Sequence, residues 1–241
     1  MAFDRKIEYL NDKIAEAKNI VFFTGAGIST ESGIKDFRSA GGIWDSSPEE
    51  LCHVRTLNYL PVSFFNFYKK SFDCRKYKPN IAHKKIAELE KTGKNITVVT
   101  QNVDGLHQKA GSSNVYEIHG TIAKNHCMEC QREFEIDFIF NSESAIPICP
   151  YCGGRVRPNI VCYGEGLPEE EYSQSLAAIR KADLVIVCGT SLVVYPAAGM
   201  LREVPPEKLV IINKSRTSFD SKASLVFNNG LGEVFSKVVV E

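Results

Sequence analysis

Short apolar runs that alternate with helical stretches are the feature that most constrains how this chain of 241 residues folds. Apolar residues occupy successive positions in these runs, as is typical of parallel strands buried on both faces. Their alternation with helices predicts an α/β fold with a doubly wound, parallel, Rossmann-like sheet. The runs are NIVFFTG (19–25), NITVVTQN (95–102), VYEIHG (115–120), PNIVCYGE (158–165), DLVIVCGTS (183–191), KLVIIN (208–213) and a weaker SLVF (224–227).

Two stretches carry clear helix signals. Residues 4–18 place apolar side chains at helical spacing. In residues 168–182 a proline opens the segment, three glutamates fill the first turn, and an arginine and a lysine lie near its end. This arrangement suits the start and stop preferences of helices and the helix dipole, so we predict a helix in each stretch.

Two regions interrupt the alternation. Residues 39–78 contain a Gly-Gly pair, the only tryptophan and the aromatic stretch SFFNFYKKSF, whereas residues 121–157 contain four of the eight cysteines. We predict that the first region is a helical insertion, that the second is a metal-binding insertion, and that together they form a small domain. Residues 1–38, 79–120 and 158–241 then form the large domain around the sheet.

The four cysteines of the second region have the spacing of a zinc site. Cys127 and Cys130 form one CxxC pair, and Cys149 and Cys152 form another after eighteen intervening residues. Four thiolates complete a tetrahedron and leave no position for water or substrate, so we expect one structural zinc ion per chain. Some zinc ribbons bind nucleic acid, but the charge balance of this chain lends that alternative little support.

The charge balance and the N-terminus bear on partners and compartment. Lys plus Arg and Asp plus Glu are 29 each, so no global field favours nucleic acid or anionic membranes. The basic stretch 69–78 is a local exception, and such runs are usually solvated. The first residues lack the apolar core of a signal peptide, and no apolar run approaches the ~20 residues of a membrane span. We therefore expect a cytoplasmic protein with reduced thiols.

The segment TGAGISTESGIKDFRS (24–39) follows the first predicted strand. Gly25 and Gly27 suit the start of a dinucleotide phosphate loop, in which backbone amides face a pyrophosphate. The pattern departs from the dehydrogenase fingerprint, because Thr30 stands where a third glycine belongs and no strand with an acidic ribose ligand follows. The DFR sequence (36–38) places an aromatic ring where it is able to cover a cofactor. Alone, the segment is equally compatible with an ordinary strand-turn-helix connection.

Polar clusters follow several of the predicted strands. They are TQNVDGLH, EIHG, CYGE, GTSL and IIN. A single cluster of this kind is usually turn chemistry, and a lone His119 is usually a partly buried structural residue. Open parallel sheets bind ligands at the carboxyl edge of their strands, however, and here several clusters converge on that edge. The set therefore indicates a binding site.

The order GAGIS, DFR, TQNVDGLH, HG, two CxxC pairs, YGE, GTSL and IN resembles the sirtuin family of NAD-dependent protein-lysine deacylases, in its bacterial or archaeal type. The resemblance runs from about residue 20 to residue 235. It implies that the large domain binds NAD and that the metal-binding insertion holds zinc. Two residues depart from the family pattern: Lys35 replaces the usual proline before DFR, and Tyr163 replaces the usual phenylalanine before GE.

The resemblance also implies roles for individual residues. His119 would be the general base, and an imidazole suits this role because its ordinary pKa of ~6.5 lies near the working pH. Asp104 and the backbone at Val103 would bind the nicotinamide amide, Gln101 and Asn102 the ribose, and Ser191 and Asn213 the adenosine. The other NAD-binding positions would be Gly25, Ala26, Gly27, Thr30, Asp36, Phe37, Arg38, Gly189, Thr190 and Leu231. The acyl-lysine peptide would be an added strand bound by Val161, Tyr163, Gly164, Glu165 and Val193.

The implied reaction is deacetylation of protein lysine, with cleavage of nicotinamide from NAD and transfer of the acetyl group to ADP-ribose as 2′-O-acetyl-ADP-ribose. A protein ADP-ribosyltransferase that uses the same cleavage is the main alternative, although His119 favours deacylation. A dehydrogenase is disfavoured by the missing third glycine, and a zinc-ribbon binding module leaves the other motifs unexplained. His107 is a rival imidazole. The sequence predicts acyl-lysine proteins or peptides as partners and makes no prediction of oligomeric state.

Overall fold

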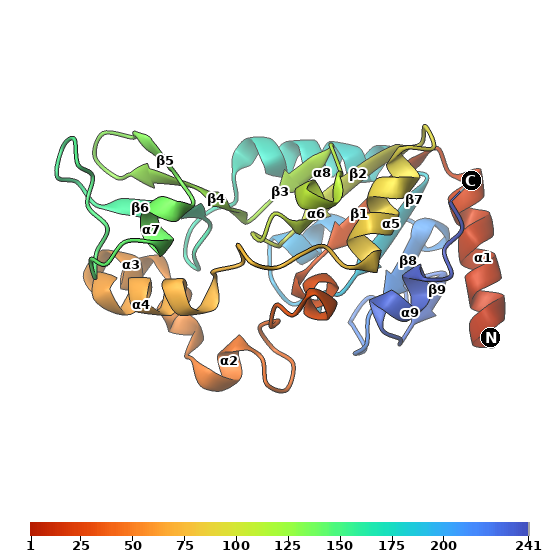
Figure 1. Ribbon diagram of the computed structural model, residues 1–241. Helices are drawn as coiled ribbons and strands as arrows, with labels where there is room; N and C mark the ends of the chain where they lie inside the picture. The colour runs from red at the N-terminus through yellow and green to blue at the C-terminus, as the bar shows by residue number, and fades with distance from the viewer. Residues whose placement is uncertain (241) are drawn as a thin grey trace.

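A six-stranded parallel sheet forms the centre of the protein in the computed structural model, which describes residues 1–240 (Figure 1). Its strand order is β3-β2-β1-β7-β8-β9, and every neighbouring pair is parallel. The order reverses between β1 and β7, the kind of position where open sheets bind ligands. The strands are β1 (Asn19–Thr24), β2 (Asn95–Thr100), β3 (Val115–Glu117), β7 (Leu184–Cys188), β8 (Leu209–Ile212) and β9 (Leu225–Phe227). The predicted Rossmann-like α/β class is confirmed.

Helices cover both faces of this sheet, which explains why the strands are apolar at successive positions. One hydrophobic cluster joins Phe22, Val98 and Ile186 to α1 (Phe3–Glu16), α5 (Ile81–Glu90) and α9 (Leu231–Phe235). The other joins Phe23 and Val187 to α8 (Glu169–Lys181) and the 3₁₀ helix η3 (Ala197–Leu201). The connections carry α6 (Leu106–Ala110) and the 3₁₀ helices η1 (Ala26–Ser32) and η4 (Pro206–Lys208). The two helices predicted from sequence are α1 and α8.

A small lobe lies at one end of the molecule, on the left in Figure 1. It combines a three-stranded sheet of order β5-β4-β6 with short helices. A single hydrophobic cluster unites Leu57 and Phe64 of the helical insertion with Ile139 and Val156 of the cysteine-containing insertion. The elements are α2 (Ile43–Ser46), η2 (Glu49–Cys52), α3 (Val54–Tyr59), α4 (Pro61–Ser71), β4 (Gly120–Cys127), β5 (Glu133–Glu135), α7 (Asp137–Phe140) and β6 (Val156–Ile160).

The prediction for one strand was wrong about the sheet to which it belongs. The run 158–165 was expected in the parallel sheet, but β6 ends at Ile160 and pairs antiparallel with β4 in the small lobe. Burial in β6 alternates between buried and partly exposed residues, because only one of its faces packs against the lobe's core. The rest of the run forms a loop, so the boundary predicted at residue 158 falls inside β6. The other domain boundaries stay predictions.

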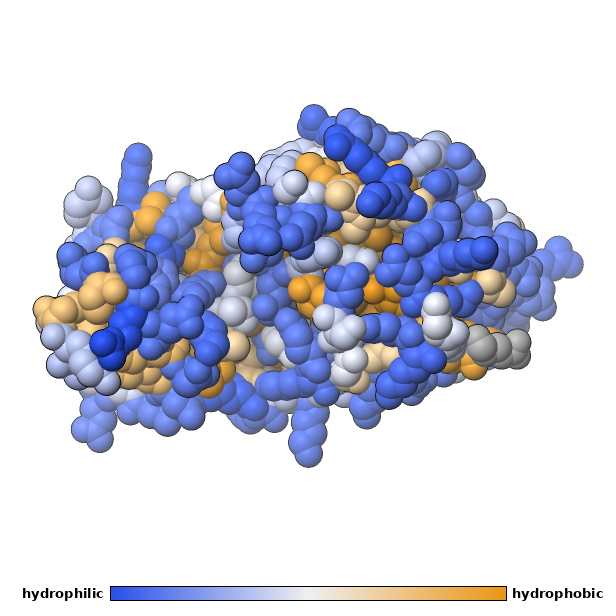
Figure 2. Space-filling view, turned by 90° about the horizontal axis from the view of Figure 1, so that it is seen from above, coloured by the Kyte–Doolittle hydropathy of each residue, from blue (hydrophilic) through white to orange (hydrophobic). Residues whose placement is uncertain are grey.

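The surface is mostly polar on the face that Figure 2 shows, where hydrophobic side chains are visible mainly in hollows between protruding hydrophilic ones. Within residues 1–240, none of the helices combines the length and the apolar character that crossing a lipid bilayer requires.

Candidate active site

A cavity of about 430 Å³ lies where the carboxyl edge of the parallel sheet meets the small lobe. Its walls come from the loops that follow β1, β2, β7 and β8, together with parts of the helical insertion and the loop after β6. The polar clusters that the sequence placed after separate strands therefore do meet in one space. Of the residues predicted for catalysis, NAD and peptide, only Thr30, Val193 and Leu231 are not part of the lining.

These three residues have other surroundings. The hydroxyl of Thr30 donates a hydrogen bond to the Gly27 carbonyl at 2.9 Å, within the loop that follows β1. Leu231 is buried in the hydrophobic cluster under α9. Val193 is exposed in the loop after β7. Thr30 is thus placed to support the lining residue Gly27, whereas Leu231 belongs to the core and Val193 is exposed on the surface.

The loops after β1 and β7 touch at two glycines. The amide of Gly27 donates to the Gly189 carbonyl at 2.8 Å, and a Cβ at Gly27 would lie 2.7–2.9 Å from the Gly189 backbone. Gly189 also has a φ of 62°, in the left-handed region that favours glycine. The glycine pattern therefore serves loop packing at the sheet edge, and the close approach to a phosphate stays a prediction.

His119 lies between β3 and β4, where the chain passes from the large sheet to the small one. Its Nδ1 is 3.1 Å from the Gln101 carbonyl oxygen. Because a carbonyl only accepts, Nδ1 carries the proton and Nε2 keeps the lone pair in the neutral ring. Burial lowers the pKa of His119, and the bond to Gln101 opposes this only in part. A neutral imidazole with a free ring nitrogen therefore lines the cavity at neutral pH.

Asp104 belongs to a buried polar cluster in the cavity wall. The Ser29 hydroxyl donates to Asp104 Oδ2 at 2.7 Å, the Leu106 amide donates to Oδ1 at 2.9 Å, and the Asn102 amide nitrogen donates to Ser29 Oγ at 3.1 Å. Burial raises the pKa of Asp104. Ser29 was not among the predicted residues, although its place in GAGIS and its complete burial make it the hub of this cluster.

His107, the rival imidazole, is buried and does not line the cavity. Its Nε2 lies 3.1 Å from the hydroxyl of Thr24, which donates to Thr100 Oγ1 at 2.8 Å. Thr100 Oγ1 also accepts from the Asn102 amide at 3.0 Å. Burial holds the pKa of His107 well below its usual range. His107 therefore joins the ends of β1 and β2 beneath the site.

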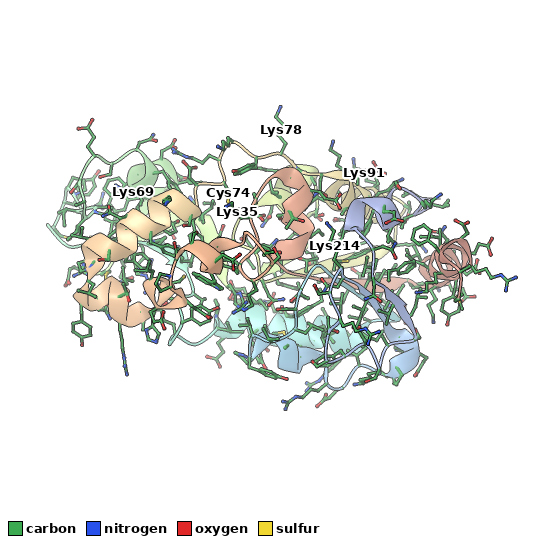
Figure 3. The ribbon with its side chains drawn as sticks, turned by 90° about the horizontal axis from the view of Figure 1, so that it is seen from below. Lys35, Lys69, Cys74, Lys78, Lys91 and Lys214 are labelled. Atoms are coloured by element: carbon green, nitrogen blue, oxygen red, sulfur yellow. The ribbon has the colours of Figure 1, made fainter. Side chains whose placement is uncertain are left out.

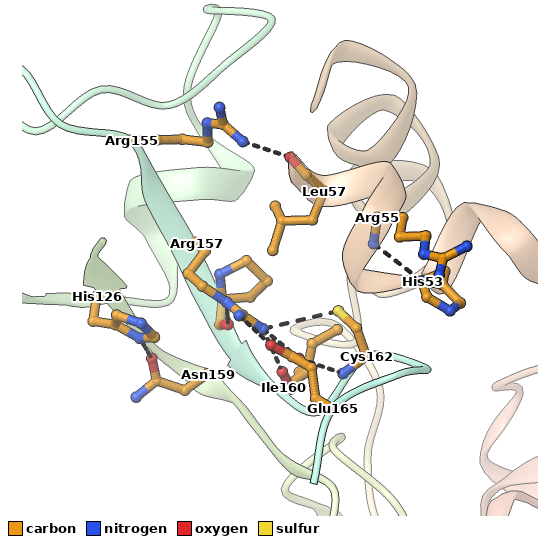
Figure 4. Close-up of polar contacts among 11 residues, drawn as sticks. His53, Arg55, Leu57, His126, Arg155, Arg157, Asn159, Ile160, Cys162 and Glu165 are labelled. Carbon is orange, nitrogen blue, oxygen red and sulfur yellow. Dashed lines mark hydrogen bonds and ion pairs between the residues drawn. The ribbon is translucent and has the colours of Figure 1, made fainter. Parts of the chain in front are cut away.

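The loop after β6 is held by an ion pair (Figure 4). Arg157 Nη1 and Nη2 contact the two Glu165 carboxylate oxygens at 2.6 and 2.8 Å, and the Cys162 amide donates to Glu165 Oε2 at 2.8 Å. Tyr163 pairs with the helical insertion, because its amide donates to the Cys52 carbonyl and its carbonyl accepts from the Val54 amide. Glu165 thus fixes the shape of the loop.

The four predicted zinc ligands converge in the small lobe. Their sulfur atoms all lie within 4.8 Å of one another, with Cys127 and Cys152 at 3.4 Å and Cys130 and Cys149 at 3.8 Å. Zinc–sulfur bonds of 2.3 Å in a tetrahedron require sulfur separations of roughly 3.8 Å. The Cys130 amide donates to Cys127 Sγ, and this lowers the pKa of Cys127 to about 7. The cluster fits one zinc ion, and none of its members lines the cavity.

A parallel sheet with a ligand cavity at its switch point, joined to a lobe with a four-cysteine cluster, defines a nucleotide-binding α/β protein with a structural metal site. Residues 25–196 match the model of the Sir2 family. The chain therefore belongs to the Sir2 family, and the resemblance to sirtuins is confirmed.

Relatives and solved structures of similar proteins agree with this assignment. An NAD-dependent protein deacetylase of Clostridium acetobutylicum is 47% identical over 97% of this chain and 98% of its own length. A protein of the same name from Clostridium perfringens is also 47% identical, over 98% of this chain and 99% of its own length. A structure of a Sir2 protein with a propionylated peptide has a TM-score of 0.87 and 37% identity, and covers 97% of each chain. Another, with a deacetylated peptide and an O-acetyl ADP ribose, has a TM-score of 0.91 and 38% identity over 96% of each chain.

Proposed function

We propose that this chain removes the acetyl group from lysine side chains of proteins or peptides, consumes NAD, and uses His119 as general base. The enzyme class itself is confirmed, because the chain has NAD-dependent protein deacetylases as relatives along nearly all of its length. The position and protonation of His119 carry the proposal for the catalytic residue: it lines the cavity, and Gln101 holds its Nδ1 proton.

The lining suits NAD in its chemistry. It offers backbone groups of the glycine loops, hydroxyls, amides and two cationic side chains, Arg38 and Lys35, the second of which is labelled in Figure 3. NAD, when bound, would supply a ribose carbon that loses nicotinamide and a ribose hydroxyl that takes up the acetyl group, so that, with one water molecule, acetyl leaves lysine as an ester of ADP-ribose. His119 Nε2 would accept the proton of the ribose hydroxyl that takes up the acyl group. The lowered pKa of His119 keeps this nitrogen free at neutral pH.

Asp104 and Val103 would bind the nicotinamide amide. This amide both donates and accepts hydrogen bonds, and a buried site shaped for it discriminates well because unpaired polar groups are costly. Ser29 and Leu106 hold the Asp104 carboxylate in place, which supports an orienting role for Asp104. Asn102 and Gln101 would bind the ribose, and Gln101 Nε2 already donates to Thr190 Oγ1 at 3.0 Å.

The remaining NAD contacts would come from both glycine loops and from the DFR segment. Thr30 would act indirectly, through its bond to Gly27, and Leu231 would act through its packing in the core at the start of α9. The direct contacts would come from Gly25, Ala26, Gly27, Asp36, Phe37, Arg38, Gly189, Thr190, Ser191 and Asn213, which all line the cavity.

The acyl-lysine peptide would lie as an added strand between the loop after β6 and the loop after β7. Val161, Tyr163, Gly164 and Glu165 line the cavity on the first side, and Val193 is exposed on the second. Glu165 would contribute by fixing its loop through Arg157. Solved relatives that hold acetylated or propionylated peptides support a peptide substrate.

The activity is tested by mass spectrometry of an acetyl-lysine peptide incubated with the protein and NAD. The expected products are free lysine peptide, nicotinamide and O-acetyl-ADP-ribose in equal amounts. A peptide or protein that gains ADP-ribose and keeps its acetyl group would instead indicate the transferase alternative.

A further inference from the structure

Arg38, Tyr163 and Glu49 form a polar network at the edge of the cavity. Arg38 Nη2 donates to the Tyr163 hydroxyl oxygen at 2.9 Å and contacts Glu49 Oε1 at 3.2 Å. The network joins three separate segments: the DFR loop after β1, the 3₁₀ helix η2 in the helical insertion, and the loop after β6.

Part of the Arg38 guanidinium remains free to bind a ligand. A guanidinium has five N–H donors, and both contacts of Arg38 use Nη2. Within residues 1–240 the Nη1 and Nε donors of Arg38 have no hydrogen-bond partner, and Arg38 lines the cavity together with Lys35. One end of the side chain is therefore anchored, while three N–H groups remain for an anionic ligand.

The anchoring residues are themselves held in place. Backbone bonds hold Tyr163 to Cys52 and Val54, and its ring lies 6.4 Å from that of Trp44. Burial, together with the nearby Glu49 carboxylate, raises the pKa of Tyr163 to about 12, so the hydroxyl keeps its proton. Arg38 and Glu49 are partly exposed, at 36% and 45% of the side chain, so their ion pair alone is a weak restraint. The Tyr163 hydroxyl adds a second contact to Arg38, and this contact comes from a residue whose backbone is held by two hydrogen bonds.

We propose that Tyr163 is a positioning residue for NAD, whose hydroxyl holds the Arg38 guanidinium ready for the pyrophosphate. This inference rests on the proposed function. Preorganisation of an arginine increases affinity for a phosphate group because less side-chain freedom is lost on binding. One departure from the family pattern belongs to this arrangement, because a phenylalanine at position 163 would lack the hydroxyl that restrains Arg38.

The test is a double-mutant cycle read by calorimetric binding of ADP-ribose, which carries the same pyrophosphate, and by KM for NAD. Tyr163→Phe is expected to weaken ADP-ribose binding and raise KM for NAD by about two- to tenfold, as for loss of one ordinary hydrogen bond. In the Arg38→Ala background the same change is expected to have no further effect. Glu49→Gln is expected to act in the same direction as Tyr163→Phe, and Glu50→Gln, the neighbouring exposed residue, serves as the matched control.

The outcomes separate this inference from the proposed function. Wild-type affinity in Tyr163→Phe, or an equal loss with and without Arg38, would overturn the positioning role. A wild-type protein that neither binds ADP-ribose nor consumes NAD would instead contradict the proposed function. The comparison uses variants whose thermal midpoints equal that of the wild type. If Tyr163→Phe is unstable, ADP-ribose binding by Glu49→Gln tests the positioning role instead.

Discussion

The His119 Nδ1 and the Gln101 carbonyl oxygen lie 3.1 Å apart, and this contact ties the passage between the two lobes to the loop after β2. It fixes which ring nitrogen carries the proton, and it sets the plane of the imidazole. Catalytic histidines are commonly oriented in this way by a partner on the nitrogen that does not react. With His119 as the proposed general base, the deacetylation rate should depend on the protonation of this ring.

The pH dependence of deacetylation follows from this. The pKa of His119 is lowered from 6.5, mainly by burial, so the active neutral form persists as pH falls through that value. We expect kcat/KM to be flat around neutral pH and to decline only below pH 6.5. A profile of kcat/KM from pH 5 to 9 checks this. An acid limb centred above pH 7 would contradict it.

Asp104→Asn is expected to weaken recognition of nicotinamide. The change alters a group that accepts from Ser29 and Leu106, and it disturbs a buried site in which an unpaired polar atom costs about 1–3 kcal/mol. We expect about tenfold weaker inhibition of the enzyme by free nicotinamide. Inhibition curves for the variant and the wild type measure this, and identical curves would remove Asp104 from the nicotinamide site.

Cys149→Ser is expected to lose zinc and to lower the thermal midpoint. The four sulfur atoms converge outside the cavity, so the metal acts through folding, and the loss of a structural zinc removes folding free energy. Metal analysis and thermal unfolding of the variant test this, with chelator treatment of the wild type as a parallel experiment. A zinc-free variant with wild-type stability would show that the cluster is dispensable.

Glu117→Gln is expected to change how stability depends on pH. Burial raises the pKa of Glu117 to about 7, from 4.5. The folded state therefore keeps this proton at pH values where the unfolded state has lost it, so Glu117 costs stability increasingly between pH 4.5 and 7. The midpoint of Glu117→Gln relative to wild type should rise across that window and then level off. Glu8→Gln, at an exposed position of α1, should show no such trend. A parallel trend in both variants would show that the effect does not come from a buried Glu117 carboxyl.

The large sheet could be predicted because both of its faces are buried, and this leaves continuous apolar runs in the sequence. The run from residue 158 has the same apolar character as the strands of the large sheet, yet β6 lies in the three-stranded sheet of the small lobe. The difference arises from tertiary pairing with β4, which a single sequence does not encode locally. The zinc ligands could be predicted because two CxxC pairs at this spacing are typical of a four-thiolate structural zinc site.

The supporting residues of the site could not be predicted in the same way. Ser29 contacts Asp104 across 75 positions of sequence, and Tyr163 contacts Arg38 across 125. Such contacts depend on how loops from different strands meet, and a serine or a tyrosine has many ordinary roles. Burial also supports His119 over His107 as the proposed base, since His107 is 1% exposed and packed beneath the site.

The most direct test of the central claim is single-turnover deacetylation of an acetyl-lysine peptide by His119→Ala, with ADP-ribose binding measured on the same preparation. We expect the rate to fall about 10²–10⁴-fold, as for loss of a general base, while ADP-ribose binding stays as in wild type. His126→Ala, at a partly buried histidine of β4 outside the cavity, is the matched control and should keep the wild-type rate. Deacetylation by His119→Ala at the wild-type rate would contradict the claim.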